Sequence, residues 1–536
     1  MNRPPGHDVT KLQRALLTGF FILVTVALVR FGFTQGQPIL GLLIPLIGIA
    51  SWFIGRPAIL FCTVLFAENA RLLIPGITAT LGVSELFQVL LIGWMLLDIS
   101  VRHQKRPFSF RKNPDLWMII FALNMFMIMQ LRGSGFAMLG GSVYGGTAYV
   151  SMFLSIVFYF ASTRIHLCEQ HVKTLLWMVL AGALVFSLVQ IAATFFPSGF
   201  GWMTKFVGAQ AEKIIEEQSR EGGVVRWTAF SLVSYALIPI AYILCRRKST
   251  RLVLIVLAFI LVGMTGARSR IFQVGVLVFL AGIYFSKNRI KTLTVWALAG
   301  LLVFGFLMIA APMLPRAVQR SVSSIPFIPV DAEIAERAAV SSDWRFDLWR
   351  DYCIPNIPKY LLVGRGIAHD ITGFAWLQSK WYGSSEFFYF MGRYHSGPLT
   401  LLLDLGLAGF VSFTMFFLLV LKDSWSTVKK YAFKCDTLVK RYYVYLTLSM
   451  SFEVFNYYFI FGDIRGSLFR MLITAVQLRI LKKNFLMEAL PEAGMSEVRS
   501  QRSGVSSATQ QLTTGNQTPV NRWARTSQGS DLRRLL

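Results

Sequence analysis

Residues 251–285 read RLVLIVLAFILVGMTGARSRIFQVGVLVFLAGIYF, two apolar runs joined by a short connection that contains Arg268 and Arg270. A helix needs about 20 mostly apolar residues to cross a hydrocarbon core of about 30 Å. Similar runs recur from residue 15 to about residue 479, and they leave no room for a large soluble domain. The pattern therefore predicts an all-α, polytopic transmembrane helical bundle.

The composition agrees with this prediction. The 536 residues are 54% hydrophobic and only 15% charged, and the mean hydropathy is +0.55, values that lie outside those of soluble globular domains. The formal net charge of +26 could suggest a nucleic-acid partner. The Lys and Arg residues, however, form short clusters between apolar runs, where the positive-inside rule places them. We therefore expect membrane lipids, and no nucleic acid, among the partners.

We predict about fourteen spans, and twelve also fit the profile because the shortest runs could be broken or tilted helices. The runs lie at residues 15–33, 38–54, 57–74, 80–98, 116–133, 147–164, 173–195, 228–245, 252–266, 271–286, 292–312, 397–421, 442–461 and 466–481. One long polar segment, 313–396, interrupts the series.

Loop charge predicts the orientation of the spans. Basic clusters at 102–112, 246–248, 287–291 and 422–441 fall in alternate loops, so we expect these loops in the cytoplasm. Five regions follow, namely a cytoplasmic N-terminus at 1–14, transmembrane helices 1–11 at 15–312, a large extracytoplasmic loop at 313–396, C-terminal transmembrane helices at 397–485 and a disordered cytoplasmic tail at 486–536. The tail is rich in Ser, Thr, Gln and Arg and has few large apolar residues.

The long loop contains a predicted amphipathic helix at residues 343–352. Helical spacing places Trp344, Leu348, Trp349 and Tyr352 on one face. We expect Ser342 or Asp343 to cap its start and Pro355 to stop it near its end. Such a helix would lie on the membrane or fold over a site.

Two arginines open the span that follows the connection at 266–270. Arg268 and Arg270 present planar forks of donors that pair with phosphate oxygens and stay charged at any working pH. The alternative is that both side chains only extend to the lipid headgroups. Ionisable groups near membrane depth are costly and are therefore candidates for a functional site.

Three further arginines lie in the long loop. Arg345 and Arg350 belong to the predicted helix, and Arg365 lies within the sequence LVGRG at 362–366. All three are candidates for binding an anionic substrate. The alternative is a surface ion pair with Asp347 or Asp351, which contributes about 0 to 1 kcal/mol.

His395 and Glu386 complete the candidate residues. His395 lies in YHSG at 394–397, directly before an apolar helix, and an imidazole can accept the proton of a sugar hydroxyl or donate to a phosphate. A lone histidine at this position is more often structural. Glu386 is embedded in a run of aromatic residues that suit sugar rings, and it could bind an acceptor hydroxyl. No cluster of acidic residues or pair of histidines on the outer face has the spacing of a metal site.

Three motifs in this order resemble those of the O-antigen ligase and O-antigen polymerase superfamily of bacterial membrane glycosyltransferases. They are Ser269-Arg270 at the start of a helix, then Arg345 with Trp349 and the GRG at 364–366, then HSGPL at 395–399 leading to GLAG at 406–409. The resemblance covers residues 250–422. Ile271 stands where the family often has Gly, and Ser396 stands where Asn is common.

The resemblance implies an enzyme of the bacterial inner membrane, with its large loop in the periplasm. Such an enzyme transfers or polymerises a glycan from an undecaprenyl-diphosphate carrier onto a hydroxyl of another glycan, lipid A-core or other acceptor, without a metal or cofactor. Arg270 and Arg345 would stabilise the diphosphate leaving group, with Arg268 or Arg365 assisting. His395 would deprotonate or orient the acceptor hydroxyl, or hold the diphosphate as a third donor.

Other functions remain open on the sequence alone. A transporter or flippase of lipid-linked glycans has the same hydropathy profile, but we find no convincing inverted repeat, and Glu68 with Arg71 is the only charged pair well inside an early span. An unrelated acyltransferase could use His395. Within the superfamily, ligase, polymerase and protein glycosyltransferase differ in their acceptor, which these motifs do not distinguish.

Overall fold

The computed structural model describes residues 56–73, 82–102, 113–133, 143–144, 146–196, 227–323, 325–367, 369–370, 385–432 and 437–489. The chain up to Lys483 forms one compact unit, and Asn484–Leu536 forms a second. The expected spans 15–33 and 38–54 lie outside the described residues, as does the expected tail from residue 490 onward.

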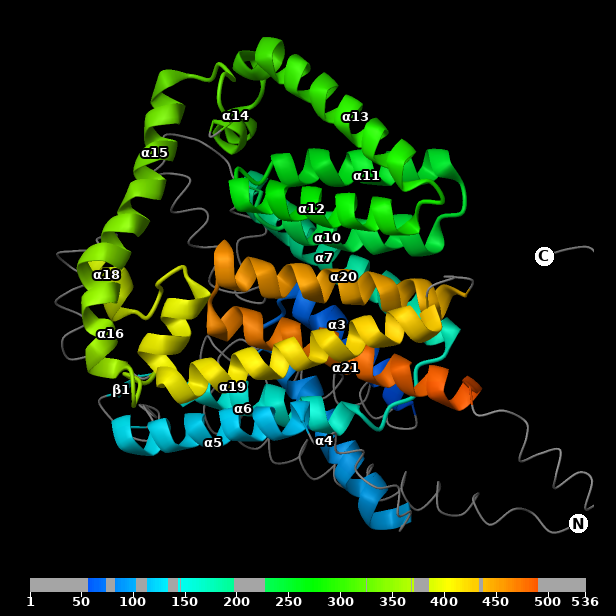
Figure 1. Ribbon diagram of the computed structural model, residues 1–536, viewed down its shortest axis with the longest axis vertical. Coiled ribbons are helices and arrows are strands. Elements are labelled where there is room, and N and C mark those ends of the chain that lie inside the picture. Colours follow the sequence, from blue (N-terminus) through cyan, green and yellow to red (C-terminus); the bar gives the residue numbers. More distant parts are fainter. Residues whose placement is uncertain are drawn as a thin grey trace, which may run out of the picture. The chain divides into compact units, whose positions relative to one another are not determined.

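The predicted all-α bundle is confirmed (Figure 1). Its helices are α3 (Pro57–Ala70), α4 (Val83–Arg102), α5 (Pro114–Arg132), α6 (Gly146–Ser162), α7 (Glu169–Phe195), α10 (Phe230–Pro239), α11 (Lys248–Gly263), α12 (Arg268–Phe285), α13 (Arg289–Ala310), α19 (Gly397–Thr427), α20 (Leu438–Phe459) and α21 (Ile464–Ala489). Within the described residues the strands are two short ones, β1 (Val143–Tyr144) and β2 (His369–Asp370), which pair antiparallel.

Several helices have the length and apolarity of membrane spans. Among the described residues five qualify, namely α5, α7, α12, α13 with its extension to Met313, and α19 with its extension to Tyr431. α13 buries none of its residues, and its exposed side chains include Leu302 and Ile309. A helix that is apolar all round and unburied needs lipid as its solvent.

Small residues and single polar contacts hold the helices together. α3 packs against α7 at Gly182, where an added Cβ would lie 2.4 Å from the carbonyl oxygen of Phe66, so only glycine allows this approach. α5 lies beside α19 (Figure 1). There Asn124 Nδ2 donates to the carbonyl oxygen of Leu405 at 3.0 Å.

The helices of the long loop gather at one end of the bundle (Figure 1). They are α14 (Arg316–Val322), α15 (Ala332–Asp347), the π-helical turn η5 (Leu348–Cys353), α16 (Ile354–Tyr360) and α18 (Ser385–Phe390). The predicted limits of the amphipathic helix were wrong. α15 begins at Ala332, where the Asp331 side chain accepts from Glu333 N, and Pro355 sits at the start of α16, where its missing N–H is tolerated.

The predicted apolar face of that helix packs against the bundle. Leu348 and Cys353 form a buried cluster with Leu403 of α19, and Trp344 and Trp349 pack against it. The helix therefore folds over the protein, as one of the two sequence interpretations expected.

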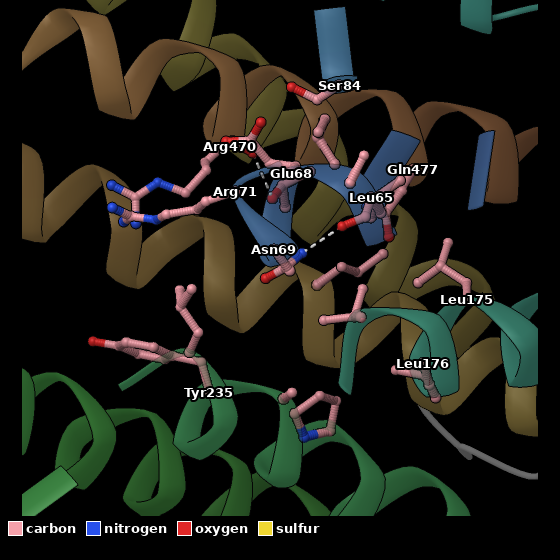
Figure 2. A pocket seen from close by; sticks show the side chains of 18 of the residues that line it. Leu65, Glu68, Asn69, Arg71, Ser84, Leu175, Leu176, Tyr235, Arg470 and Gln477 are labelled. Atoms are coloured by element: carbon pink, nitrogen blue, oxygen red, sulfur yellow. Dashed lines mark hydrogen bonds between the residues drawn. The ribbon is translucent and has the colours of Figure 1, made fainter. Parts of the chain in front are cut away.

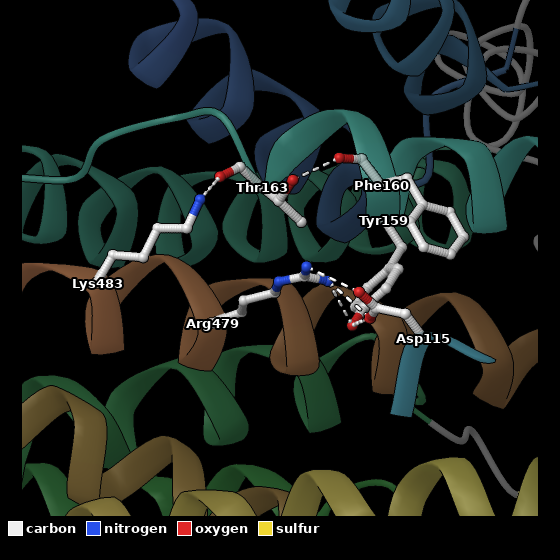
Figure 3. Close-up of polar contacts among 6 residues, drawn as sticks. All are labelled: Asp115, Tyr159, Phe160, Thr163, Arg479 and Lys483. Atoms are coloured by element: carbon white, nitrogen blue, oxygen red, sulfur yellow. Dashed lines mark hydrogen bonds and ion pairs between the residues drawn. The ribbon is translucent and has the colours of Figure 1, made fainter. Parts of the chain in front are cut away.

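A buried ion pair links three helices at the opposite end (Figure 3). Arg479 of α21 donates to both carboxylate oxygens of Asp115 in α5, at 2.8 and 2.9 Å. The Tyr159 hydroxyl of α6 donates to the same carboxylate at 2.9 Å. One turn further on, Lys483 Nζ donates to the carbonyl oxygen of Thr163 at 2.6 Å. The two buried charges, Arg479 and Asp115, are thus paired with each other.

Candidate active site

His395 lies in the turn that leads into α19, with a backbone φ of +55°, which is uncommon for a residue with a side chain. Gly397 lets this turn approach α20, because an added Cβ would lie 2.2 Å from the carbonyl oxygen of Tyr457. A Cβ on Gly462, in the turn after α20, would lie 2.4 Å from Gly397 Cα. The two glycines therefore hold the His395 turn against the turn between α20 and α21.

Aromatic rings enclose the imidazole of His395. Its centroid lies 5.2 Å from that of Trp344, 5.8 Å from that of Phe388 and 5.1 Å from that of Phe461. Neither ring nitrogen has a hydrogen-bond partner among the described residues. Burial, and next the positive charge of Arg345, lower the pKa of His395 to about 4. The ring is therefore neutral at physiological pH.

Arg345 lies beside His395, and its guanidinium is 5.7 Å from the ring centre of Trp344. Its Nε is buried without a hydrogen-bond partner among the described residues. Burial and the charges of Arg268 and Arg320 lower the pKa of Arg345, yet an arginine remains charged in proteins. Three guanidiniums within electrostatic reach of one another suit an anionic ligand.

Arg268 and Arg270 both lie in the first turn of α12, but they face different ways. Two positions along a helix correspond to a rotation of about 200°. Arg268 Nη2 accordingly donates to the carbonyl oxygen of Ala338 in α15, at 2.8 Å, whereas Arg270 Nη1 donates to Gln273 Oε1 at 3.2 Å. Arg268 thus faces the loop helices, and Arg270 faces the bundle.

A hydrogen-bond network holds Arg270 and connects it to the turn after α20. The hydroxyl of Tyr235 donates to Gln273 Oε1, and Gln273 Nε2 donates to Asn456 Oδ1 at 2.6 Å. Asn456 Nδ2 donates to the carbonyl oxygen of Phe461 at 3.3 Å. All five residues line a cavity of about 200 Å³. Because the Phe461 ring also contacts the His395 ring, this network joins Arg270 to His395.

A larger cavity of about 570 Å³ adjoins the first, and both are lined by Asn69, Tyr235, Glu453 and Arg470. Figure 2 shows Arg71, at the end of α3, extending side by side with Arg470, with the Tyr235 hydroxyl pointing to the same side. Arg71 ends α3 in the left-handed backbone region, with a φ of +48°. Its guanidinium lies 5.3 Å from the ring centre of Phe186. It also lies within electrostatic reach of Arg470 and Arg270.

Arg365 lies in a different environment from Arg345. Its Nη2 is 3.6 Å from Asp404 Oδ1, and its Nη1 donates to the carbonyl oxygen of Tyr389 at 2.9 Å. The Tyr394 hydroxyl donates to the same Asp404 carboxylate at 2.9 Å. The structure therefore places Arg365 in a buried contact between the loop and α19.

The two remaining candidates lie outside the arginine group. Arg350 is 72% exposed and pairs with Asp347 and Asp351, at 2.9 and 2.7 Å, which is the surface ion pair that the sequence left as its alternative. Glu386 is half-buried in the first turn of α18.

The sequence reasoning missed Arg320, Glu453 and Arg470. Glu453 could have been found, since it is the only acidic or basic residue between Tyr442 and Phe461, and charges within spans mark functional sites. Arg470 carried the same signal, because it lies within the predicted span 466–481, whereas Arg320 carried none. Across the described residues, no three His, Cys, Asp or Glu side chains lie close enough together to hold a metal ion.

A comparison with known protein families finds a match within the chain. Residues 253–414 match the family model described as O-antigen ligase. This segment is similar to an O-antigen ligase domain. This confirms the resemblance to the O-antigen ligase superfamily. A search among curated proteins finds no match.

The O-antigen ligase domain covers only part of the site. It includes Arg268, Arg270, Arg345 and His395. It supplies Arg270, Gln273 and Leu277 to the smaller cavity, whereas all the residues that line the larger cavity lie outside the matched segment.

Proposed function

We propose that this O-antigen ligase family glycosyltransferase moves a glycan from an undecaprenyl-diphosphate carrier to an acceptor hydroxyl at the periplasmic face of the bacterial inner membrane. The supporting observation is the group of arginines beside His395, with Arg270 joined to it through Phe461. A diphosphate leaving group gains charge as the glycosidic bond breaks. Guanidiniums fixed in advance stabilise that charge more in the transition state than in the ground state.

The proposed role of each residue follows from its position in the site. Arg345 and Arg270 hold the diphosphate from two sides, and Arg268 and Arg320 add positive charge next to Arg345. The neutral ring of His395 donates one N–H, so it can hold or orient an oxygen, and its pKa of about 4 makes it a weak base. The acceptor in this proposal is a hydroxyl of lipid A-core or of another glycan. Because arginines supply the positive charge, we propose a transfer that needs no metal.

Replacing Arg270 by Lys tests the proposal. Lysine keeps the charge and loses the planar fork, so transfer from a purified undecaprenyl-diphosphate-linked glycan should fall by about 100-fold or more. The assay is glycan transfer by protein reconstituted in lipid, normalised to folded protein. Arg350→Lys is the matched control, since Arg350 is exposed in a surface ion pair, and it should keep near-normal transfer. Normal activity of Arg270→Lys would rule out the phosphate-binding role.

A further inference from the structure

Glu453 is the carboxylate at the junction of the two cavities. It lies on α20, two turns before the end of that helix, and it lines both the cavity of Arg270 and the larger one. A charged side chain at membrane depth is costly and is kept where it has a function. None of the roles assigned above uses it.

One oxygen of this carboxylate has no donor. Glu453 Oε2 is buried and has no hydrogen-bond partner among the described residues, although Arg470 acts on it electrostatically. Glu85, another carboxylate of the bundle, differs, because its Oε2 accepts from Gly82 N and from the Ser84 hydroxyl, both at 2.9 Å. A buried acceptor without a donor calls for an explanation, and a hydroxyl group of a ligand would supply the donor.

We propose that Glu453 is the base that takes the proton of the acceptor hydroxyl, and that the adjoining cavity of about 570 Å³ holds the acceptor's terminal sugar. This inference rests on the proposed glycan transfer. His395 is less suited to the role of base, because aromatic rings enclose it and its pKa is about 4.

The lining of the larger cavity suits a sugar. Asn69 Nδ2 donates to the carbonyl oxygen of Leu65 at 2.7 Å, and its side-chain oxygen points the other way (Figure 2). Arg71 and Arg470 add forks of donors, and the Tyr235 ring adds an aromatic face. Polar groups of this kind in a mostly apolar cavity fix the orientation of a ligand, and an aromatic face suits a sugar ring.

The reaction step balances without a further reactant. The acceptor oxygen attacks the anomeric carbon of the glycan, and its proton passes to Glu453. The bond between that carbon and the diphosphate oxygen breaks, and its electron pair stays on the lipid diphosphate. The products are the glycosylated acceptor and the free carrier diphosphate, and the proton on Glu453 leaves to water.

Glu453→Gln should lower transfer to a hydroxyl acceptor by about 100-fold or more, the usual contribution of a general base. Binding of undecaprenyl diphosphate should stay within about threefold of the wild type, because that ligand is assigned to the arginines. Azide is an anionic nucleophile that needs no base. In its presence the variant should therefore form the glycosyl azide at a rate near that of the wild type.

Glu169→Gln is the control and should leave transfer to the hydroxyl acceptor near normal, because Glu169 lies outside both cavities in an exposed pair with Lys173. Hydroxyl transfer by Glu453→Gln at the wild-type rate would overturn the inference, as would a variant that binds the donor but gives no azide product. If Glu453→Gln does not fold, Glu453→Asp should show the same split between hydroxyl and azide. Absence of transfer and of donor binding in the wild type would instead overturn the proposed function itself.

Discussion

His395 should make the protein more sensitive to acid. Its folded-state pKa of about 4 lies below the ordinary value of about 6.5. Between these two pH values the unfolded chain binds a proton that the folded protein excludes, so the stability of the fold falls as the pH drops from about 6.5 to about 4. Thermal unfolding in detergent should show a drop in Tm across this window that is larger than in His395→Gln. Equal pH dependence would show that His395 titrates normally.

Arg345 and Arg365 show that the same residue type makes different contacts in different surroundings. Both lie in the long loop, and the sequence treated both as phosphate-binding candidates. Arg365 meets the Asp404 carboxylate, whereas Arg345 meets Arg268 and Arg320. Arg365 is therefore paired within the fold, whereas the arginines around Arg345 form a positively charged environment that suits an anionic ligand.

The two glycine motifs, GRG at 364–366 and GLAG at 406–409, act at the level of helices and loops. α19 bends at Gly406, where φ is +67°, and the bend lets Leu407 N donate to the carbonyl oxygen of Leu361 at 2.6 Å. Gly364 fits against the same bend, since an added Cβ would lie 2.2 Å from the carbonyl oxygen of Asp404. These contacts dock residues 361–364 of the long loop onto α19.

Gly406→Ala should therefore destabilise the protein. Its Cβ would lie 2.8 Å from the carbonyl oxygen of Leu362, in a backbone region that alanine adopts at a cost of about 1 to 3 kcal/mol. Thermal unfolding and transfer activity should both be reduced. Gly305→Ala in α13, where an added Cβ meets nothing within 4 Å, should be neutral or stabilising. Equal behaviour of the two variants would show that the bend has no structural role.

At the level of the whole bundle, the buried pair of Asp115 and Arg479 joins α5 to α21, two helices far apart in the chain. Arg479→Met should lower stability by about 3 to 5 kcal/mol, because it leaves the Asp115 carboxylate buried and uncompensated. Adding Asp115→Asn should restore much of that loss. Lys173→Met, which breaks an exposed pair with Glu169, should cost less than about 1 kcal/mol. The measurement is urea or thermal unfolding of all variants in one detergent.

The sequence by itself determined the all-α membrane fold and the resemblance to the O-antigen ligase superfamily, because hydropathy and short motifs are local properties that each stretch of chain carries. It also indicated Arg270, Arg345 and His395, since each lies beside a span or in the long loop. It could not separate Arg345 from Arg365, set the start of α15, or reveal that Glu453 faces the cavity of Arg270. Those outcomes depend on contacts between residues that are far apart in the chain. Close packing at glycines and the pairing of buried charges bring these residues together, and both arise only in the tertiary structure.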